Sequence, residues 1–314
     1  MAADTQRLLI SIIIPTVNQV ELVRACLASL AACQPSVLYP YEIIVADDGS
    51  PPEIQQGLRE AVRAYQARLI TWPHNSGFSA TVNRGVAQSK GGFICLLNND
   101  VTLVQKNWLD LMMADALRPR VGVVGLRLLY PNGRIQHGGL IYLPQSGAFD
   151  HEYRSLPGDY PPANRGREVL GVTGALMLIN RRLWDVLGGM DEQFFVGMED
   201  IDFSLRAWEK GWRIYYTGNA FAIHPEGATR GHNPFWQAKG MESGQRFQRK
   251  WQRKLNLFGS ACRASGHTRF GQTMPSVSEA QAILWRKLAN RCINASVSFR
   301  PHDPHPTYRF HFFK

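Results

Sequence analysis

Polar side chains suited to ligand binding follow apolar runs at several separate points in this sequence. Asp47 and Asp48 follow YEIIVA, Asn98-Asn99-Asp100 follow FICLL, and His224 follows FAI. An Asp and a His that converge make a mixed oxygen and nitrogen site for Mn²⁺ or Mg²⁺, to which Asn can add a carbonyl oxygen. Such an ion neutralises a diphosphate leaving group, and a separate carboxylate can take a proton from an attacking hydroxyl. Adjacent acids also occur at Glu199 and Asp200.

Each of these residues also has a purely structural interpretation. Asn and Asp favour turns because their side chains bond nearby backbone, so Asn98–Asp100 can end a strand without binding a ligand. Asp47 or Asp48 can cap a helix, Glu199 and Asp200 can favour a helix dipole, and His224 can be a core histidine. Single Asp and His residues are common, so the sequence alone leaves both interpretations open.

The elements that must position these residues alternate between strand and helix. Asn18 with Glu21, and Ser50 with Glu53, have the spacing of helix N-terminal caps. This alternation favours an α/β fold with a mainly parallel sheet flanked by helices, whose ligands bind beyond the carboxyl ends of the strands. The short apolar runs predict buried strands over residues 9–14, 41–46, 68–72 and 93–97.

The pattern becomes less regular after Asp100. A strand over residues 121–129 is predicted to form a hairpin with a second strand over 135–142, because Pro131-Asn132-Gly133 marks a turn. Residues 150–167 are rich in Pro, Gly and charge, and a long irregular segment inside a domain is usually functional or mobile. Two short strands over 213–216 and 221–223 and a C-terminal helix over 276–291 complete the prediction.

The net charge of +10 on the 314 residues is concentrated near the C-terminus. Residues 230–314 hold 15 Lys and Arg against 3 Asp and Glu. A basic surface of this kind can bind anionic lipid headgroups, a phosphate-bearing acceptor or nucleic acid, or it can be a solvated helical face. No apolar run reaches the roughly 18 residues of a membrane span, and the five cysteines form no CxxC pair, which predicts a cytoplasmic protein with reduced thiols.

Seven segments, taken in order, resemble one enzyme family: IIIPTVN, IIVADDGS, NSGFSATVNRG, GGFICLLNND, VTGALMLINRRLWDVLGGMDEQFF, MEDIDFSLRAWEKGWRIYY and AIHPEGATRG. The sequence is similar to the inverting family 2 glycosyltransferases with the GT-A (nucleotide-diphospho-sugar transferase) fold. It is most similar to the bacterial branch that builds O-antigen, rhamnan and galactofuranan chains. The resemblance implies a catalytic domain over residues 1–231, with a nucleotide-binding half over about 8–102 and an acceptor half over about 103–231. Residues 232–314 lie beyond it and are predicted to form a basic helical C-terminal extension.

The resemblance implies transfer of a sugar from a nucleotide-diphosphate donor to a hydroxyl of a glycan or lipid-linked acceptor, in the synthesis of a surface polysaccharide. It implies Asp200 as the general base, Glu199 as the residue that orients the acceptor or the base, and Mn²⁺ or Mg²⁺ held by Asp100 and His224. The residues implied to contact the nucleotide or the sugar are Pro15, Thr16, Asp47, Asn75, Gly77, Asn98 and Asn99, with Thr173 and Gly174 in the sugar and acceptor pocket.

Four further residues are candidates for structural or acceptor-binding roles. Asp202 and Arg206 are expected to pair, because they lie one helical turn apart. His137 and His151 border the irregular segment, and they either touch the acceptor or have surface or loop roles.

Two positions depart from the family's pattern. Asn98 stands where the DxD motif usually begins with Asp, which weakens or alters the expected use of metal, and Val17 stands where many relatives carry an aromatic residue. The departure at Asn98 keeps open an inactive scaffold with a transferase-like fold. The basic extension keeps open a nucleic-acid-binding protein, although nucleic acid is not the favoured partner, and it also suggests a peripheral position on the inner membrane face.

Other enzyme classes are disfavoured by the segment after the first strand. It contains neither the phosphate loop of a nucleotidyltransferase nor the GxGxxG of a dinucleotide dehydrogenase. Within the transferase interpretation, dTDP-rhamnose and UDP-hexoses are both open as donors.

Overall fold

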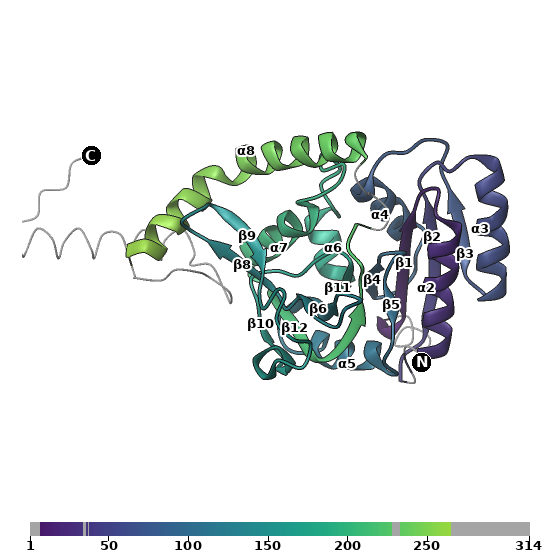
Figure 1. Cartoon of the computed structure of the whole chain (residues 1–314), viewed down its shortest axis with the longest axis horizontal. Helices are drawn as coiled ribbons and strands as arrows, with labels where there is room; N and C mark the ends of the chain where they lie inside the picture. The colour runs from purple at the N-terminus through teal and green to yellow at the C-terminus, as the bar shows by residue number, and fades with distance from the viewer. Residues whose placement is uncertain (1–6, 34–35, 37, 228–232, 265–314) are drawn as a thin grey trace, which may run out of the picture.

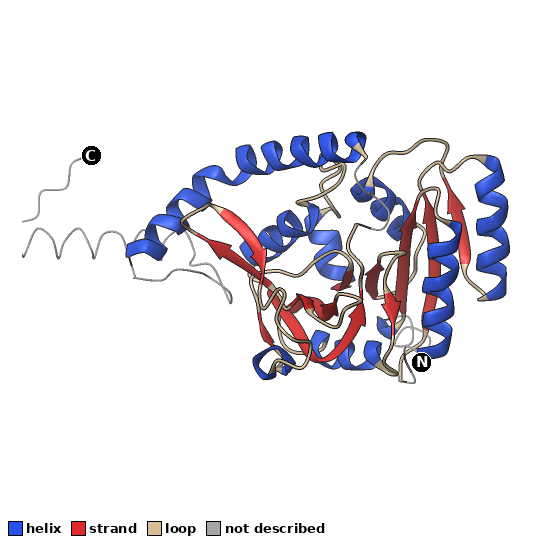
Figure 2. Ribbon diagram, in the orientation of Figure 1, coloured by secondary structure: helices blue, strands red, loops and turns tan. Residues whose placement is uncertain are grey.

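The computed structural model describes residues 7–33, 36, 38–227 and 233–264, which form an α/β fold with helices on both faces of a central sheet (Figure 2). The first half follows the predicted alternation closely (Figure 1). Its elements are β1 (Ile10–Thr16), α2 (Val20–Cys33), β2 (Tyr41–Asp47), α3 (Pro52–Ala64), β3 (Arg68–Thr71), α4 (Phe78–Ala87), β4 (Phe93–Leu97) and β5 (Thr102–Leu103).

The second half is longer and less regular. Its elements are α5 (Trp108–Ala116), β6 (Val121–Leu129), β7 (Ile135–His137), β8 (Leu140–Leu143), β9 (Ala148–His151), the short 3₁₀ helix η1 (Pro161–Asn164), β10 (Arg167–Glu168), β11 (Leu176–Asn180), α6 (Arg181–Leu187), α7 (Glu199–Glu209), β12 (Arg213–Ile223) and α8 (Pro234–Ala264).

The central sheet has the strand order β10-β12-β6-β11-β4-β1-β2-β3. The block β3, β2, β1 and β4 is parallel, β11 runs antiparallel between β4 and β6, and β12 is parallel to β6. Strands β1, β2, β3, β4, β6 and β12 therefore all point the same way, and their carboxyl ends share one edge with the start of β11. This sheet confirms the predicted α/β fold class.

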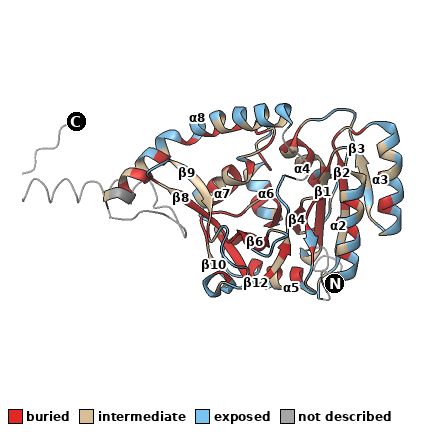
Figure 3. Ribbon diagram, in the orientation of Figure 1, coloured by how far each residue is buried: buried red, intermediate tan, exposed pale blue. Residues whose placement is uncertain are grey.

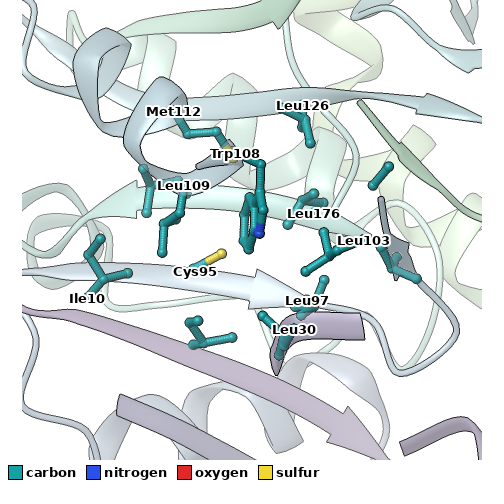
Figure 4. Close-up of a cluster of buried hydrophobic side chains, with 14 of the residues drawn as sticks. Ile10, Leu30, Cys95, Leu97, Leu103, Trp108, Leu109, Met112, Leu126 and Leu176 are labelled. Carbon is teal, nitrogen blue, oxygen red and sulfur yellow. The ribbon is translucent and has the colours of Figure 1, made fainter. Parts of the chain in front are cut away.

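Both faces of the sheet are buried, and this explains the continuous apolar runs in its strands. Ile12 of β1 and Cys95 of β4 face the layer of α2, α3 and α5, whereas Ile13 and Leu96 face the layer of α4, α6 and α7. Trp108, which is fully buried, fills the centre of the first layer (Figure 4).

The long helix α8 packs through one face onto the second half of the molecule (Figure 3). Phe247, Trp251, Leu255 and Phe258 are buried on that face and form one cluster with Leu205 of α7 and other residues. Among the described residues, no helix is both long and apolar enough to cross a membrane. The predicted division at residue 231 stays a prediction, and the helix predicted over 276–291 lies outside the described residues.

Several local predictions were wrong, and each has a physical reason. Asn18 does not cap α2, because it adopts a left-handed conformation (φ 57°) and donates its backbone N–H to Ser50 Oγ (2.8 Å). Ser50 in turn does not cap α3; its hydroxyl binds Asp47 instead.

Two strand boundaries also differ from the prediction. The strand predicted over 135–142 is two strands, since the chain turns at Gly139 (φ 104°): β7 pairs with β6, and β8 pairs with β9 in a separate sheet. The two short strands predicted over 213–223 are one strand, β12, with an irregularity between Thr217 and Phe221.

Candidate active site

A cleft of about 410 Å³ lies at the edge of the sheet where the parallel strands end. Asp47 and Asn75 are the only predicted site residues that do not line it. The predicted residues that do line it are Pro15, Thr16, Gly77, Asn98, Asn99, Asp100, Thr173, Gly174, Glu199, Asp200 and His224.

The link between β3 and α4 is fixed by Asp48, which was predicted to lie at a strand end but was given no specific role in the site. Its carboxylate accepts hydrogen bonds from the backbone N–H groups of Ser76 (2.9 and 3.0 Å) and Gly77 (2.9 Å). Asn75 supports the same turn, because its side-chain oxygen accepts from Gly77 N–H at 3.1 Å. Gly77 has φ 88°, and an added Cβ would lie 2.5 Å from the carbonyl oxygen of Phe195, so the loop requires glycine here.

Asp47 is the last residue of β2, next to Asp48, and is fully buried. Its Oδ1 accepts hydrogen bonds from the hydroxyl and backbone N–H of Ser50, whereas its Oδ2 has no hydrogen-bond partner among the described residues. Burial raises the pKa of Asp47, and the hydrogen bonds from Ser50 oppose that rise. The structure therefore keeps a partly unsatisfied carboxyl group next to the cleft.

Asn98, Asn99 and Asp100 follow β4 as predicted and turn into the cleft. The backbone N–H of Asn98 donates to Ala175 O (2.9 Å), and the amide of Asn99 donates to Thr16 Oγ1 (2.9 Å). Asp100 Oδ1 lies 3.2 Å from His224 Nε2 but does not form a hydrogen bond with it, since Oδ1 has no hydrogen-bond partner among the described residues. The name "Asp100 side" is used below for Asp48, Asn98, Asn99, Asp100 and His224.

Gln136 fixes the orientation of the His224 ring, a role that no motif or spacing in the sequence indicated. Gln136 Oε1 lies 2.8 Å from His224 Nδ1, and the amide of Gln136 also binds the carboxylate of Glu226. A carboxylate only accepts, so the amide nitrogen faces Glu226, the amide oxygen faces His224, and Nδ1 carries the proton. This leaves the lone pair of Nε2 directed at Asp100, which is the arrangement that orients a metal-binding histidine.

These residues fit a divalent cation. A carboxylate oxygen and an imidazole lone pair that face each other at 3.2 Å repel unless a proton or a metal ion lies between them. The described residues hold no cluster of three or more His, Cys, Asp or Glu suited to a metal. The protein thus offers Asp100 and His224, and other ligands must come from water or from the phosphates of a substrate, as is usual for Mg²⁺.

Asp200 faces the same cleft from the first turn of α7. Its Oδ2 accepts a hydrogen bond from the backbone N–H of Gly174 (3.0 Å), and its Oδ1 accepts from that of Ile201 (2.8 Å). Glu199 is buried beside it and also lines the cleft. The name "Asp200 side" is used below for Gly174, Glu199, Asp200 and His151.

Helix α7 is held from behind by Asp202. The predicted pair with Arg206 is confirmed at 2.8 Å, and Trp251 of α8 donates its indole N–H to the other oxygen of Asp202 at 2.8 Å. Lys250 of α8 lies 2.7 Å from the same carboxylate. Helix α8 therefore helps to fix the helix that carries Asp200.

Trp236, at the start of α8, also lines the cleft and was missed by the sequence reasoning. Its ring lies 5.8 Å from that of Phe195, centroid to centroid. No signal could have found it, because it lies beyond the part of the chain that resembles the family.

The cleft has an acidic character. Asp48, Asp100, Glu199, Asp200 and Glu226 are among its lining residues, and its described lining contains no Lys or Arg. An anionic diphosphate would be repelled from this lining without a cation, so the electrostatics agree with the metal-binding geometry.

A mixed, mainly parallel α/β sheet flanked by helices, with a polar cleft at its strand ends, defines a protein with a GT-A-like fold. The solved structure of the mannosyltransferase PcManGT from Pyrobaculum calidifontis, in complex with GDP-Man and Mn²⁺, has the same fold. The TM-score is 0.57 at 15% identity, over 93% of this chain and 81% of that one.

Sequence comparison then gives the family. The profile described as Glycosyl transferase family 2 matches residues 11–187, more than half of the chain, so the protein belongs to glycosyl transferase family 2. The family predicted from the seven segments is confirmed.

Two curated relatives show how far the likeness extends. The O-antigen biosynthesis protein RfbC of Myxococcus xanthus is 33% identical over 228 residues, which are 70% of this chain but only 18% of that protein. The N-acetylglucosaminyl-diphospho-decaprenol L-rhamnosyltransferase of Mycobacterium tuberculosis (strain ATCC 25618 / H37Rv) is 26% identical over 225 residues, 62% of this chain and 70% of that enzyme.

Proposed function

We propose that this protein is a metal-dependent, inverting glycosyltransferase that moves a sugar from a nucleotide-diphosphate donor to a hydroxyl of a glycan or lipid-linked acceptor. One observation carries the proposal: Asp100 and His224 face each other without a hydrogen bond in the same cleft as Asp200, a carboxylate held in place by backbone N–H groups. A cation site and a separate base in one cleft are the two groups that a single displacement with a diphosphate leaving group needs.

Asp100 and His224 would hold Mn²⁺ or Mg²⁺, which would supply positive charge to the departing diphosphate. Asn98 and Asn99 would touch ribose or phosphate, and Asn98 in place of an acid leaves Asp100 as the one carboxylate of the DxD-like segment. On the other side of the cleft, Asp200 would take the proton of the acceptor hydroxyl, and Glu199 would orient the acceptor or the base.

The nucleotide would lie against the ends of β1 and β2. Pro15 and Thr16 line the cleft there, and Asp47 would bind the base from behind if its free Oδ2 became accessible. Gly77 and Asn75, in the loop fixed by Asp48, would cover the nucleotide. Thr173 and Gly174 would line the sugar and acceptor pocket, so residues 8–102 would form the donor half and 103–231 the acceptor half.

The acceptor is proposed to be a growing surface glycan on a lipid carrier. Support comes from the relatives, one named for O-antigen biosynthesis and one for rhamnosyl transfer to a decaprenol-linked sugar. The basic residues after 230 would bring the enzyme to the anionic cytoplasmic face of the membrane. In the described helix α8, Arg249 and Arg253 are exposed, whereas Lys250 and Lys254 pair with carboxylates of the same chain.

The test of the catalytic proposal uses the purified protein with UDP-, dTDP- and GDP-linked sugars, with and without Mn²⁺. We expect one donor to raise the unfolding temperature only when Mn²⁺ is present, and ¹H NMR of the product to show an inverted anomeric configuration. A folded protein that no donor stabilises would favour the inactive scaffold, and strong salt-sensitive binding of oligonucleotides would favour the nucleic-acid alternative.

The membrane proposal has its own test. Sedimentation with vesicles of phosphatidylglycerol and phosphatidylcholine should carry the protein down, whereas vesicles of phosphatidylcholine alone should not. Equal binding to both vesicle types would contradict an electrostatic docking role for the basic extension.

A further inference from the structure

A buried histidine, His137, and a partly buried one, His151, meet beside the cleft and are not used by the mechanism above. His137 ends β7 and His151 ends β9, and their Nδ1 atoms lie 2.7 Å apart. The ring centroids are 4.8 Å apart, with the ring planes at 79°. His137 is fully buried, whereas His151 lines the cleft.

The hydrogen bonds around this pair define where each proton lies. The backbone N–H of Thr173 points at His137 Nε2 (3.4 Å), and a backbone N–H can only donate, so Nε2 must carry a lone pair. The proton of His137 is then on Nδ1, and it is donated to His151 Nδ1. His151 therefore accepts at Nδ1 and carries its own proton on Nε2.

The opposite arrangement is excluded by the same contacts. If His151 donated from Nδ1, His137 would have to carry its proton on Nε2, where it would meet the N–H of Thr173. Burial lowers the pKa of His137 and His151, which agrees with two neutral rings. Because Nδ1 of His151 faces His137, Nε2–H is the edge of the ring that can face the cleft.

One backbone segment ties this pair to Asp200. The N–H of Thr173 binds His137, and the N–H of the next residue, Gly174, binds Asp200 Oδ2 at 3.0 Å. The carboxylates of Asp200 and Glu226 both interact with His151 and raise its pKa against the effect of burial. A hydrogen-bond donor and a base are thus positioned together by two consecutive amides.

We propose that His151 Nε2–H binds a hydroxyl oxygen of the acceptor next to the hydroxyl that Asp200 deprotonates, so that the acceptor is a sugar with two adjacent free hydroxyls. This inference rests on the proposed function. A donor on the attacking oxygen itself would compete for the lone pair that forms the new bond, whereas a donor on its neighbour fixes the ring without weakening the nucleophile.

The proton balance of the transfer leaves His151 unchanged. The O–H bond of the attacking hydroxyl breaks and its proton goes to an oxygen of Asp200. The oxygen's electron pair forms the bond to the anomeric carbon, and the diphosphate leaves with the electrons of the old C–O bond. His151 is therefore a positioning residue that keeps its proton throughout.

The first test is a double-mutant cycle between the protein and the acceptor. It uses octyl glycosides and their monodeoxy analogues, with the donor and Mn²⁺ identified by thermal shift. For wild type, removal of the neighbouring hydroxyl should lower kcat/KM about tenfold, the size of one hydrogen bond. His151→Phe should lose the same factor on the parent glycoside and nothing further on the deoxy analogue, and His151→Gln should recover most of it because its amide can donate from nearly the same place.

The outcomes separate this inference from the proposed function. The role of His151 would be overturned if His151→Phe and removal of the acceptor hydroxyl each lowered kcat/KM independently, so that the combined loss was the product of the two. It would also be overturned if the donor raised the unfolding temperature of His151→Phe less than that of wild type. Either result would leave the transferase proposal intact. No donor shift in wild type would overturn both.

The second test needs no activity. Long-range ¹H–¹⁵N NMR spectra of protein labelled at histidine should show His137 in the Nδ1–H form and His151 in the Nε2–H form, assigned with His151→Gln. A spectrum with His151 protonated at Nδ1 would contradict the proposal, and this readout stands even if the Phe variant does not fold.

Discussion

The two sides of the cleft treat their carboxylates in opposite ways. On the Asp200 side, both oxygens of Asp200 already accept backbone N–H groups. On the Asp100 side, Asp100 Oδ1 and His224 Nε2 face each other at 3.2 Å without a hydrogen bond, and the nearby Asp47 Oδ2 is buried without a described partner. The Asp200 side is therefore set before any substrate arrives, whereas the Asp100 side keeps unsatisfied polar atoms that a ligand would complete.

The largest expected effect follows from Asp200→Asn. The amide keeps the size of the side chain but cannot take a proton, so kcat should fall about 1000-fold, within the usual range for a general base. Because the Asp200 side does not hold the cation, the Mn²⁺-dependent thermal shift with the donor should stay within error of wild type. If the donor no longer raised the unfolding temperature, Asp200 would take part in donor binding, and the two sides of the cleft would not have separate roles.

Asp100→Asn should mainly weaken the binding of the cation, which Asp200→Asn should leave unchanged. Removal of the one carboxylate ligand should weaken Mn²⁺ binding at least about 100-fold, a larger effect than is typical for residues behind the ligands. Titration of Mn²⁺ by calorimetry, with the donor present, measures this directly. The free energy of unfolding without ligand should be unchanged or slightly higher than that of wild type, because the unsatisfied charge beside His224 is removed.

The convergence of Asp48 and Asn98–Asp100 could be predicted from sequence because these residues follow parallel strands, and parallel strands end at one edge by geometry. The neighbours of His224 could not be predicted in this way. Gln136 lines the cleft through the pairing of β7 with β6, and His151 lines it through a small second sheet after the break at Gly139. His137 lies buried against His151. Sequence periodicity does not report pairings of that kind. The hydrogen bond from Trp251 to Asp202 joins residues 49 positions apart in the chain. Trp251 lies in α8, which the family resemblance does not reach.

Gln136→Leu should have a smaller effect on the same side of the cleft. Its amide oxygen fixes the proton of His224 on Nδ1, and loss of such a partner typically weakens metal binding about tenfold. The measurement is again Mn²⁺ titration with donor. Gln193→Leu, which removes an exposed amide that binds Arg246, is the matched control and should leave Mn²⁺ affinity unchanged. Equal affinity in both variants would mean that His224 needs no orienting partner.

The smallest effect concerns the adjacent acids Asp47 and Asp48, which differ in the same way as the two sides of the cleft. Asp48 accepts backbone N–H groups, whereas one oxygen of Asp47 is buried without a described partner. Burial raises the pKa of Asp47, so the folded protein binds a proton there more tightly than the unfolded chain does. The native state then binds more protons than the unfolded state, and stability falls as pH rises from the unfolded pKa through the folded one. Asp47→Asn carries no such charge. Its free energy of unfolding at pH 7 should be about 1 kcal/mol higher than that of wild type, the size expected when one unsatisfied buried polar atom is relieved.

The advantage of Asp47→Asn should shrink as the pH is lowered through the folded pKa, because wild-type Asp47 then becomes neutral too. Urea unfolding at several pH values measures this difference. Asp48→Asn is the matched contrast, because the wild-type carboxylate accepts three contacts from the N–H groups of Ser76 and Gly77. The free energy of unfolding of this variant should be about 1 to 2 kcal/mol lower than that of wild type at pH 7. If Asp47→Asn gains stability but loses the donor shift, the buried charge is retained for the nucleotide. If it keeps the full shift, Asp47 has no part in donor binding, and of the two acids only Asp48 contributes to that edge.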